Sequence, residues 1–416
     1  MIDLEVPKKF VPLVRQAGSL ADEVFRPISR KYDLAEHEYP RELDLTSALI
    51  DGLSDSGASQ GAGARGSTNA GASETPAGVG AGRREKKEQG NKNGANLSSV
   101  LSVMQTCRGD VGLTLSIPRQ GLGNAVIAAV ANDEQKERYG NRWAAMAITE
   151  PDMGSDSGAI RTTAVKDGDE YVLNGEKIFV TAGERAELVV VWATLDRDLG
   201  KKAIKSFVVE RSNPGLKLAR LEHKLGIRAS DTAAFSLQDC RVPAQDLLGD
   251  PEIRTEGGFG GAMQTFDNTR PLVAAMACGL ARGCLDLITE KLAEVGVQPD
   301  HDAPLHRQPA AAARLVELEA EFEAAYLLTL RAAWMADNGH PNSMEASMAK
   351  AKAGRTCVEI SLACVELAGA SGYAETELFE KWARDSKILD IFEGTQQIQL
   401  LVVARRLLGL TSAQLK

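Results

Sequence analysis

Residues 163–194 read TAVKDGDEYVLNGEKIFVTAGERAELVVVWAT, and this stretch decides the fold class. Its short segments rich in Val, Ile, Phe and Thr predict β-strands at Glu170–Leu173, Lys177–Thr181 and Glu187–Ala193. Asp167-Gly168 and Asn174-Gly175 stand beside these segments and predict tight turns. Because no crossover helices separate the strands, the pattern favours an antiparallel β domain over a parallel dinucleotide-binding sheet.

The β pattern continues through Ser206–Glu210 and Thr232–Leu237, which predicts a middle domain over residues 146–255. On either side the apolar residues recur at threes and fours, as in amphipathic helices. These positions are Phe10, Leu13, Val14, Ala17, Leu20, Val24, Leu101, Met104, Val111, Leu115 and Leu122 before it, and Leu315, Leu318, Phe322, Tyr326, Leu330, Ile398, Leu401, Val402 and Leu408 after it. The sequence therefore predicts an α+β chain, with an N-terminal helical domain at residues 1–145, the middle antiparallel β domain, and a C-terminal helical bundle at residues 256–416.

Residues 51–96 interrupt the first helical domain with a stretch rich in small and charged residues and almost free of large apolar ones. Such a composition cannot offset the entropy lost on ordering, so it predicts a disordered insert. Gly78, Gly80 and Gly82 resemble part of a dinucleotide-binding fingerprint, but no strand precedes them and no apolar helix follows. A nucleotide-binding loop is therefore disfavoured here.

Composition excludes several classes of protein. The 416 residues are 44% hydrophobic and carry a formal net charge of −9, without a long basic block, so we expect no nucleic-acid partner. No apolar run reaches the roughly 18 residues of a membrane helix, and the N-terminus lacks a secretory or transit pattern. We therefore expect no membrane span and a cytoplasmic location. Six cysteines without a CxxC pair indicate neither a disulfide framework nor a zinc site, and we predict no metal.

The chain contains no GxxxxGK[ST], HExxH or GxSxG motif, which removes the usual signatures of phosphate transfer, zinc hydrolysis and serine-triad chemistry. Two segments remain in the middle domain. Residues 147–156, AITEPDMGSD, form a loop of small and hydroxyl residues, whose backbone N–H groups could bind an anion or a ring carbonyl. Residues 177–183, KIFVTAG, form an apolar strand that ends in Thr and Gly. Taken singly, an ordinary loop and a core strand are the simpler readings of the two segments.

Residues 391–400, IFEGTQQIQL, place a single carboxylate, Glu393, among apolar residues. Thr395 follows a Gly turn and is a plausible N-cap for a helix. Apolar neighbours remove solvation from a carboxylate and raise its pKa, which suits a general base near neutral pH. A Glu favoured by the dipole at a helix N-terminus is the other interpretation, and the residues alone leave both open.

Together these segments closely resemble the acyl-CoA dehydrogenase family. The resemblance covers nearly the whole chain outside the insert and rests on the order and spacing of its motifs. These are Thr149-Glu150-Pro151 with Gly154-Ser155-Asp156, Asn174-Gly175 with Lys177, Ser230-Asp231-Thr232, Phe266 to Pro271, Glu380-Lys381 with Arg384 to Ile388, and Ile391 to Gln399. The resemblance implies an N-terminal helical domain, a middle β domain and a C-terminal four-helix bundle. It also implies FAD as cofactor, an acyl-CoA thioester oxidised to its trans-2-enoyl form, and an electron-transfer flavoprotein as electron acceptor.

The resemblance also assigns roles to particular residues. Glu393 would remove the α-proton, while the β-hydrogen leaves as hydride to flavin N5. The uncharged Thr269 stands where some relatives carry their base, which leaves Glu393 as the one candidate. The expected flavin contacts are Met146, Ile148, Thr149, Ser155, Phe179, Val180, Thr181, Thr395, Gln396 and Gln397. The expected acyl-CoA contacts are Ser155, Asp267, Arg270 and Gly394, and Leu115 is expected beside the acyl chain.

The chain departs from the family at two places that serve the neighbouring subunit's cofactor. Where members carry an Arg-x-x-Phe-Gly segment, residues 293–300 read AEVGVQPD, and Glu366 replaces a usual Gln near the pyrophosphate. A carboxylate there would repel phosphate. We therefore hypothesise a half-site that is completed by a sister subunit in a heteromeric dehydrogenase. A homotetramer with weak FAD binding, a catalytically silent scaffold subunit, and an acyl-CoA oxidase or flavin monooxygenase on the same fold are the alternatives.

Overall fold

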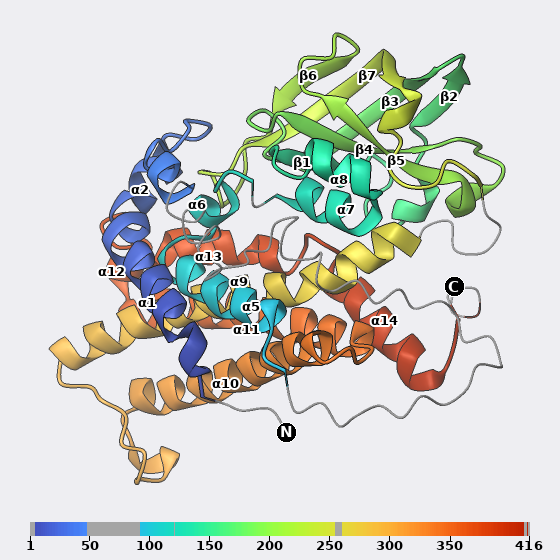
Figure 1. Cartoon of the computed structure of the whole chain (residues 1–416). Helices are drawn as coiled ribbons and strands as arrows, with labels where there is room; N and C mark the ends of the chain where they lie inside the picture. Colours follow the sequence, from blue (N-terminus) through green and yellow to red (C-terminus); the bar gives the residue numbers. More distant parts are fainter. Residues whose placement is uncertain (1–4, 48–91, 120, 254–259, 412–413, 415–416) are drawn as a thin grey trace.

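The computed structural model describes residues 5–47, 92–119, 121–253, 260–411 and 414, and it describes no side chains for residues 260–268. Most of the predicted insert at residues 51–96 therefore lies outside the described residues. The described chain has three parts, namely two helical parts and a β-sheet, which lies at the top of Figure 1. The predicted fold class is confirmed.

The first part consists of short helical segments that surround one long helix. The elements are η1 (Lys8–Phe10), α1 (Val11–Ser19), η2 (Leu20–Phe25), α2 (Arg26–Leu34), α5 (Ala95–Gly109), α6 (Val111–Leu115), α7 (Leu122–Val130) and α8 (Asp133–Tyr139). Asp110 ends α5 and caps α6, because its carboxylate accepts a hydrogen bond from the backbone N–H of Leu113 (2.8 Å). The helical run predicted after the insert is thus broken into three helices.

The sheet has seven strands: β1 (Ala144–Ala147), β2 (Thr163–Asp167), β3 (Glu170–Thr181), β4 (Leu188–Thr194), β5 (Ile204–Glu210), β6 (Leu216–Leu221) and β7 (Thr232–Pro243). Their order is β1-β4-β2-β3-β7-β6, and β5 pairs with β4. β4 is buried on both faces, since Val189 and Val191 pack in one core and Val190 and Trp192 pack in another beneath α7 and α8 (Figure 1). The helices α7 and α8 therefore belong spatially to the β domain.

Two details of the predicted sheet are wrong. Asp167-Gly168 does form a turn between β2 and β3, but Asn174-Gly175 does not. The latter pair sits at a register shift inside β3, with Gly175 at φ +153°, and a Cβ there would lie 2.5 Å from Thr162 Oγ1. The close approach of Thr162, which directly precedes β2, explains this glycine, and chain reversal does not. The sheet is also not purely antiparallel, because β4 runs parallel to β1 and β2.

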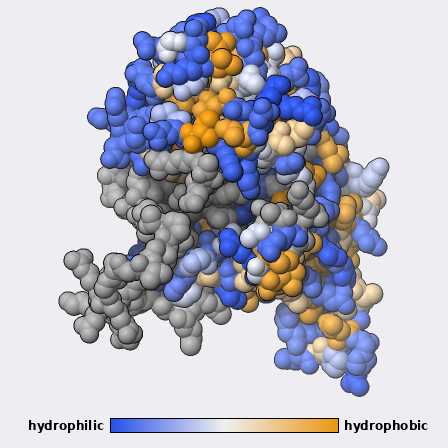
Figure 2. Space-filling view, turned by 90° about the vertical axis from the view of Figure 1, so that its right-hand side faces the viewer, coloured by the Kyte–Doolittle hydropathy of each residue, from blue (hydrophilic) through white to orange (hydrophobic). Residues whose placement is uncertain are grey.

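The third part is a helical bundle of α9 (Gly260–Glu294), α10 (Ala310–Asp337), α11 (Ser343–Ala368), α13 (Phe379–Leu389) and α14 (Gln396–Leu408), with the short α12 (Ala370–Tyr373). One hydrophobic core joins α5 to α9, α10, α11 and α13. The predicted stripe on α10 is mostly buried, whereas Leu408 at the end of the α14 stripe is 67% exposed. Figure 2 shows that hydrophobic patches lie among hydrophilic surface on the face of the molecule drawn there.

One stretch of α9, Thr269–Glu294, is long and apolar enough to cross a membrane. In the fold, 67% of its most apolar window is buried against other parts of the chain. Core helices of globular proteins share this length and composition. We therefore assign the stretch to the core of the bundle.

A buried ion cluster connects the three parts. Lys381 on α13 lies between the carboxylates of Asp110 and Asp385, and all three side chains are at most 1% exposed. The second oxygen of Asp385 accepts a hydrogen bond from the backbone N–H of Ile227, in the loop between β6 and β7 (2.5 Å). Lys381 thus neutralises two carboxylates, each of which anchors a different part of the chain.

Candidate active site

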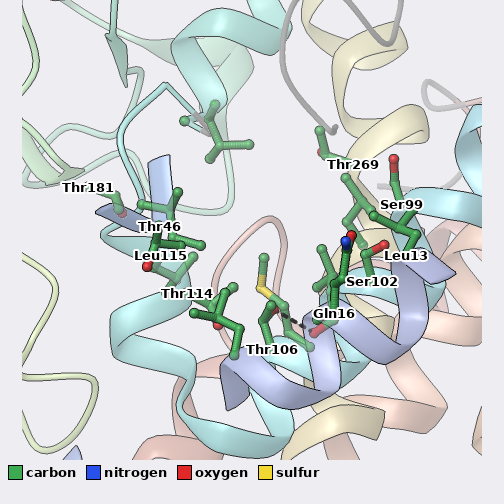
Figure 3. Close-up of a pocket in the computed structure, with 18 of the residues that line it drawn as sticks. Leu13, Gln16, Thr46, Ser99, Ser102, Thr106, Thr114, Leu115, Thr181 and Thr269 are labelled. Carbon is green, nitrogen blue, oxygen red and sulfur yellow. Dashed lines mark hydrogen bonds between the residues drawn. The ribbon is translucent and has the colours of Figure 1, made fainter. Parts of the chain in front are cut away.

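A cavity of about 590 Å³ lies between the first helical part, the end of β3 and the start of α9. Its walls are mainly apolar, and they include Leu13, Leu20, Val24, Val103, Leu115, Ile117, Leu122, Leu272, Met276 and Phe392. Thr181 from the β domain and Thr269 from α9 lie on opposite sides of it (Figure 3). Leu115, which is predicted to lie beside the acyl chain, is one of these wall residues. The cavity has the size and lining typical of a small-molecule site.

Glu393 brings a carboxylate to this cavity from the turn between α13 and α14. Thr269 Oγ1 donates a hydrogen bond to Glu393 Oε2 (2.6 Å). Burial raises the pKa of Glu393, although the Thr269 hydroxyl and the cations Arg270 and Lys350 partly oppose the shift. Of the two interpretations of this residue, the geometry favours a desolvated carboxylate that can exchange a proton near neutral pH.

The backbone that carries Glu393 is strained and tightly held. Glu393 has φ +54° and Gly394 has φ +94°, and the first value is unfavourable for any residue with a Cβ. Gln399 Nε2 donates to the carbonyl oxygens of both residues (3.1 and 3.0 Å), and Lys350 Nζ donates to that of Gly394 (2.8 Å). A Cβ on Gly394 would lie 2.5 Å from Gln399 Nε2. Two buried side chains thus fix the direction of the carboxylate.

A second buried ion pair holds the loop at residues 147–156. Lys177 Nζ on β3 contacts Glu150 Oε1 (2.8 Å) and the carbonyl oxygen of Ile148 (3.1 Å). Glu150 also accepts hydrogen bonds from the backbone N–H groups of Arg161 and Thr162 (2.6 and 2.9 Å). Burial lowers the pKa of Lys177 to about 8, despite the opposing effect of Glu150. The loop is therefore held in place by Lys177 and by the hydrogen bonds of Glu150.

The end of β3 turns toward the cavity at a second register shift, between Lys177 and Val180. Phe179 has φ +56° and is 60% exposed, while Val180 is buried and Thr181 lines the cavity. An exposed aromatic ring held at a strand end offers a flat apolar surface. This surface and Thr181 point to ring binding on the β-domain side.

The other predicted contacts occupy varied positions. Met146 is half-buried, Ile148 is buried in the sheet core, and Thr149 is half-buried in the anchored loop, where its carbonyl accepts from the N–H of Ile178 (2.9 Å). Ser155 is exposed on the same loop. The side chain of Ile148 packs inward, and its carbonyl oxygen already accepts a hydrogen bond from Lys177 Nζ.

The predicted contacts at the helical side lie around Glu393. Thr395 caps α14, and Gln396 and Gln397 form its first turn. Arg270 is only 5% exposed and lies near Glu393 and Lys350. The side chain of Asp267 lies outside the described residues. Of the predicted site residues, Thr181 and Glu393 line the cavity together.

Three residues that support Glu393 were not predicted for this role: Thr269, Lys350 and Gln399. Lys350 is 1% exposed and Gln399 is fully buried, although both residue types are usually exposed. In the sequence, Lys350 stands within the run MAKAKAG of α11, where flanking alanines are the only hint of a buried position.

Two protein-family models match most of the chain. Residues 145–240 match the family described as "Acyl-CoA dehydrogenase, middle domain", and residues 256–408 match "Acyl-CoA dehydrogenase, C-terminal domain". The mitochondrial short-chain specific acyl-CoA dehydrogenase of Rattus norvegicus is 39% identical over 75% of this chain and 76% of its own.

Two solved structures also resemble the chain. The butyryl-CoA dehydrogenase of Megasphaera elsdenii superposes with a TM-score of 0.79 at 28% identity, over 98% of this chain and 100% of that chain. A chain from the structure of the electron-transferring flavoprotein of Acidaminococcus fermentans has a TM-score of 0.78 at 30% identity, over 98% and 100% of the two chains.

Proposed function

The chain belongs to the acyl-CoA dehydrogenase family of FAD-dependent oxidoreductases, and from this premise we propose that Glu393 removes the α-proton of an acyl-CoA thioester. The observation that carries the proposal is the position of this carboxylate, which lies in an apolar cavity on a backbone turn fixed by Lys350 and Gln399. The product is the trans-2-enoyl thioester.

The proton transfer follows from the surroundings of Glu393. Burial raises the pKa of the carboxyl group, which narrows its difference from the weakly acidic thioester α-carbon. The Thr269 hydroxyl holds Oε2 by a hydrogen bond, which leaves Oε1 to accept the proton. The apolar walls exclude water, so that the proton stays on the carboxyl group until product leaves.

The backbone N–H of Glu393 supports the same reaction. Within the described residues, no hydrogen bond from this N–H to another part of the chain is found. An oriented backbone donor can bind the thioester carbonyl oxygen and stabilise the negative charge that develops there as the α-proton leaves. The strained φ of Glu393 holds base and donor in one rigid unit.

The residues around the cavity fit FAD. Phe179 offers an exposed ring face, Thr181 offers a hydroxyl in the cavity, and the exposed Ser155 lies on a loop anchored by Lys177. At the N-terminus of α14 the N–H groups of Gln396 and Ile398 are bonded to Asp390 and Thr395, but no hydrogen bond from the N–H of Gln397 is found among the described residues, so this one donor and the helix dipole suit a phosphate. When bound, FAD supplies the acceptor for the hydride that leaves the β-carbon. We further propose an electron-transfer flavoprotein as the next acceptor and a cytoplasmic location.

We keep the sister-subunit hypothesis as part of the proposal. Glu366 is exposed near the end of α11, and most of residues 293–300 are exposed beyond α9. On α14, Leu400, Leu407 and Leu408 are 54%, 66% and 67% exposed, which is apolar surface that an assembly would cover. These features support an assembled enzyme in which a second chain completes the adenine side of the FAD site.

The chain purified alone is expected to hold clearly less than one FAD per chain, and co-expression with its sister subunit is expected to restore both flavin content and turnover. Flavin-to-protein ratio and enoyl-CoA formation, measured over acyl-CoA thioesters of increasing length with an artificial acceptor, test this. One full FAD per chain in the preparation of this chain alone would end the sister-subunit hypothesis. Full flavin content without enoyl-CoA formation from any thioester would instead count against the proposed reaction.

Lys350→Met is expected to lower kcat by about tenfold to a hundredfold, because a hydrogen bond from a buried ammonium group holds the turn that carries the base. Loss of a nearby cation also raises the pKa of Glu393, so the pH profile of kcat is expected to shift to higher pH. Lys352→Met is the matched control, since Lys352 lies on the same helix but pairs with Glu321 at the surface. Equal pH profiles for Lys350→Met and wild type would contradict a positioning role.

A further inference from the structure

A cluster of metal-ligating side chains, remote from Glu393 in the sequence, lies where the first helical part meets the β domain. Glu36 and His37 follow α2, and His223 follows β6. One potential ligand atom from each of the three lies within 4.8 Å of the others. We propose that Glu36, His37 and His223 bind one zinc ion that ties these two parts of the chain together. The cysteine pattern of the sequence did not predict this site.

The ligand set and its spacing suit zinc. Two imidazoles and a carboxylate with water in the fourth position form a common three-ligand zinc site. Ligand atoms about 2.1 Å from a tetrahedral zinc ion stand about 3.4 Å from one another. Glu36 Oε2 and His223 Nδ1 are already 2.9 Å apart. The His223 side chain is 81% exposed and can turn, so a small rotation would bring the set to zinc-binding distances.

An ion pair between Glu36 and His223 would not explain why His37 is buried beside them. Both of its ring nitrogens are buried, and neither has a hydrogen-bond partner among the described residues. An imidazole without partners is costly to bury, whereas a metal would satisfy one nitrogen. His37 also has φ +74°, and Arg185 Nη2 donates to its carbonyl oxygen (3.3 Å). The ring is therefore held beside His223, with the two ring centroids 4.9 Å apart.

Glu36 is oriented as metal ligands usually are. The backbone N–H of Lys224 donates to Oε1 (2.9 Å), which directs Oε2 toward the histidines. The nearby cations are directed elsewhere, because Lys224 Nζ donates to the carbonyl of Ser230 (2.8 Å) and Arg185 pairs with Asp231 (3.4 Å).

The test is zinc binding by the full-length holoprotein after dialysis against EDTA. Calorimetry with zinc alone is expected to show one site per chain, and zinc is expected to raise the melting temperature. His223→Ala is expected to weaken zinc binding by about a hundredfold and to remove the thermal shift. This exposed side chain can be removed without disturbing the fold. His306→Ala is the control, since His306 is exposed outside the cluster, and it is expected to bind zinc like wild type.

The outcomes separate the zinc site from a simple Glu36–His223 ion pair. No saturable zinc binding by the wild-type chain would overturn the proposal. Binding that His223→Ala leaves unchanged, or that His306→Ala weakens equally, would also overturn it. The measurement needs no turnover, so its result is independent of the role of Glu393.

Discussion

Glu393→Gln is expected to lower kcat for acyl-CoA dehydrogenation by about a thousandfold, because a general base typically contributes two to four orders of magnitude. Glutamine has nearly the shape of glutamate, and its carbonyl oxygen can still accept the hydrogen bond from Thr269. The substitution therefore removes the base while it keeps the turn, the cavity and thioester binding. Steady-state kinetics should show the loss in kcat with a similar KM.

Glu23 is the rival for this assignment, because it is the other carboxylate-bearing residue among those that line the cavity. Glu23→Gln is expected to keep most of the activity. A large loss with Glu23→Gln and a small loss with Glu393→Gln would transfer the role of base to Glu23.

The pH dependence gives a further check on Glu393. The reaction needs its ionised form, so kcat should rise as the pH passes through a pKa above the usual range of a carboxyl group. Thr269 donates a hydrogen bond that lowers this pKa. Thr269→Val should therefore move the rise in kcat to higher pH.

Lys381→Met is expected to destabilise the fold by about 3–5 kcal/mol, which is the usual cost of removing one member of a buried ion cluster. It would leave the carboxylates of Asp110 and Asp385 buried together without a cation. In the native cluster, burial disfavours the ammonium charge, but Asp110 and Asp385 outweigh burial and raise the pKa of Lys381. The cluster links three parts of the chain through hydrogen bonds to Asp110 and Asp385. We therefore expect these parts to unfold together, in one cooperative transition.

Lys387→Met is the matched control, since Lys387 lies on the same helix, is 50% exposed and pairs with Asp390 (3.3 Å). It should change the free energy of unfolding by about 0.5 kcal/mol or less. Burial already raises the pKa of Asp385, and Lys381→Met removes the cation that opposes this shift, so the cost in stability grows as the pH rises and shrinks as it falls. Denaturant titrations should therefore show a smaller difference in the free energy of unfolding between Lys381→Met and wild type at acidic pH than at neutral pH. If Lys381→Met lowered the free energy of unfolding no more than Lys387→Met at every pH, the stabilising role of the buried ion cluster would be contradicted.

Local pattern predicts much of this fold because strands and helices have different periods. Residues 188–194 and 204–210 are short β-branched runs bounded by polar residues, and both are strands. Leu216–Leu221 escaped prediction because its sequence, LKLARL, contains no β-branched or aromatic residue. The Asn174-Gly175 turn was wrong because the signal for a tight turn is also the signal for a bulge, and only the packing of Thr162 separates them.

Some residues of the candidate site can be named from local sequence, and others cannot. Glu393 and Thr181 both line the cavity, and each lies in a motif that is continuous in the sequence, so both could be named as candidates from the sequence. Lys350, Thr269 and Gln399 could not, because their functions depend on contacts such as that between Lys350 and Gly394, which are 44 residues apart. The contact between Lys381 and Asp110, which lie 271 residues apart, could not be predicted from local sequence either. Nor could the contact between His223 and Glu36.

Proton exchange at the α-carbon tests the central claim most directly. A 3-thia-acyl-CoA carries sulfur in place of the β-carbon, so no hydride can leave, and only removal of the α-proton remains observable. In D₂O, the flavin-loaded wild-type protein is expected to exchange the α-hydrogens of this thioester, as followed by proton NMR, and Glu393→Gln is expected to abolish the exchange. Equal exchange by the wild-type protein and Glu393→Gln would contradict the assignment of Glu393 as the base.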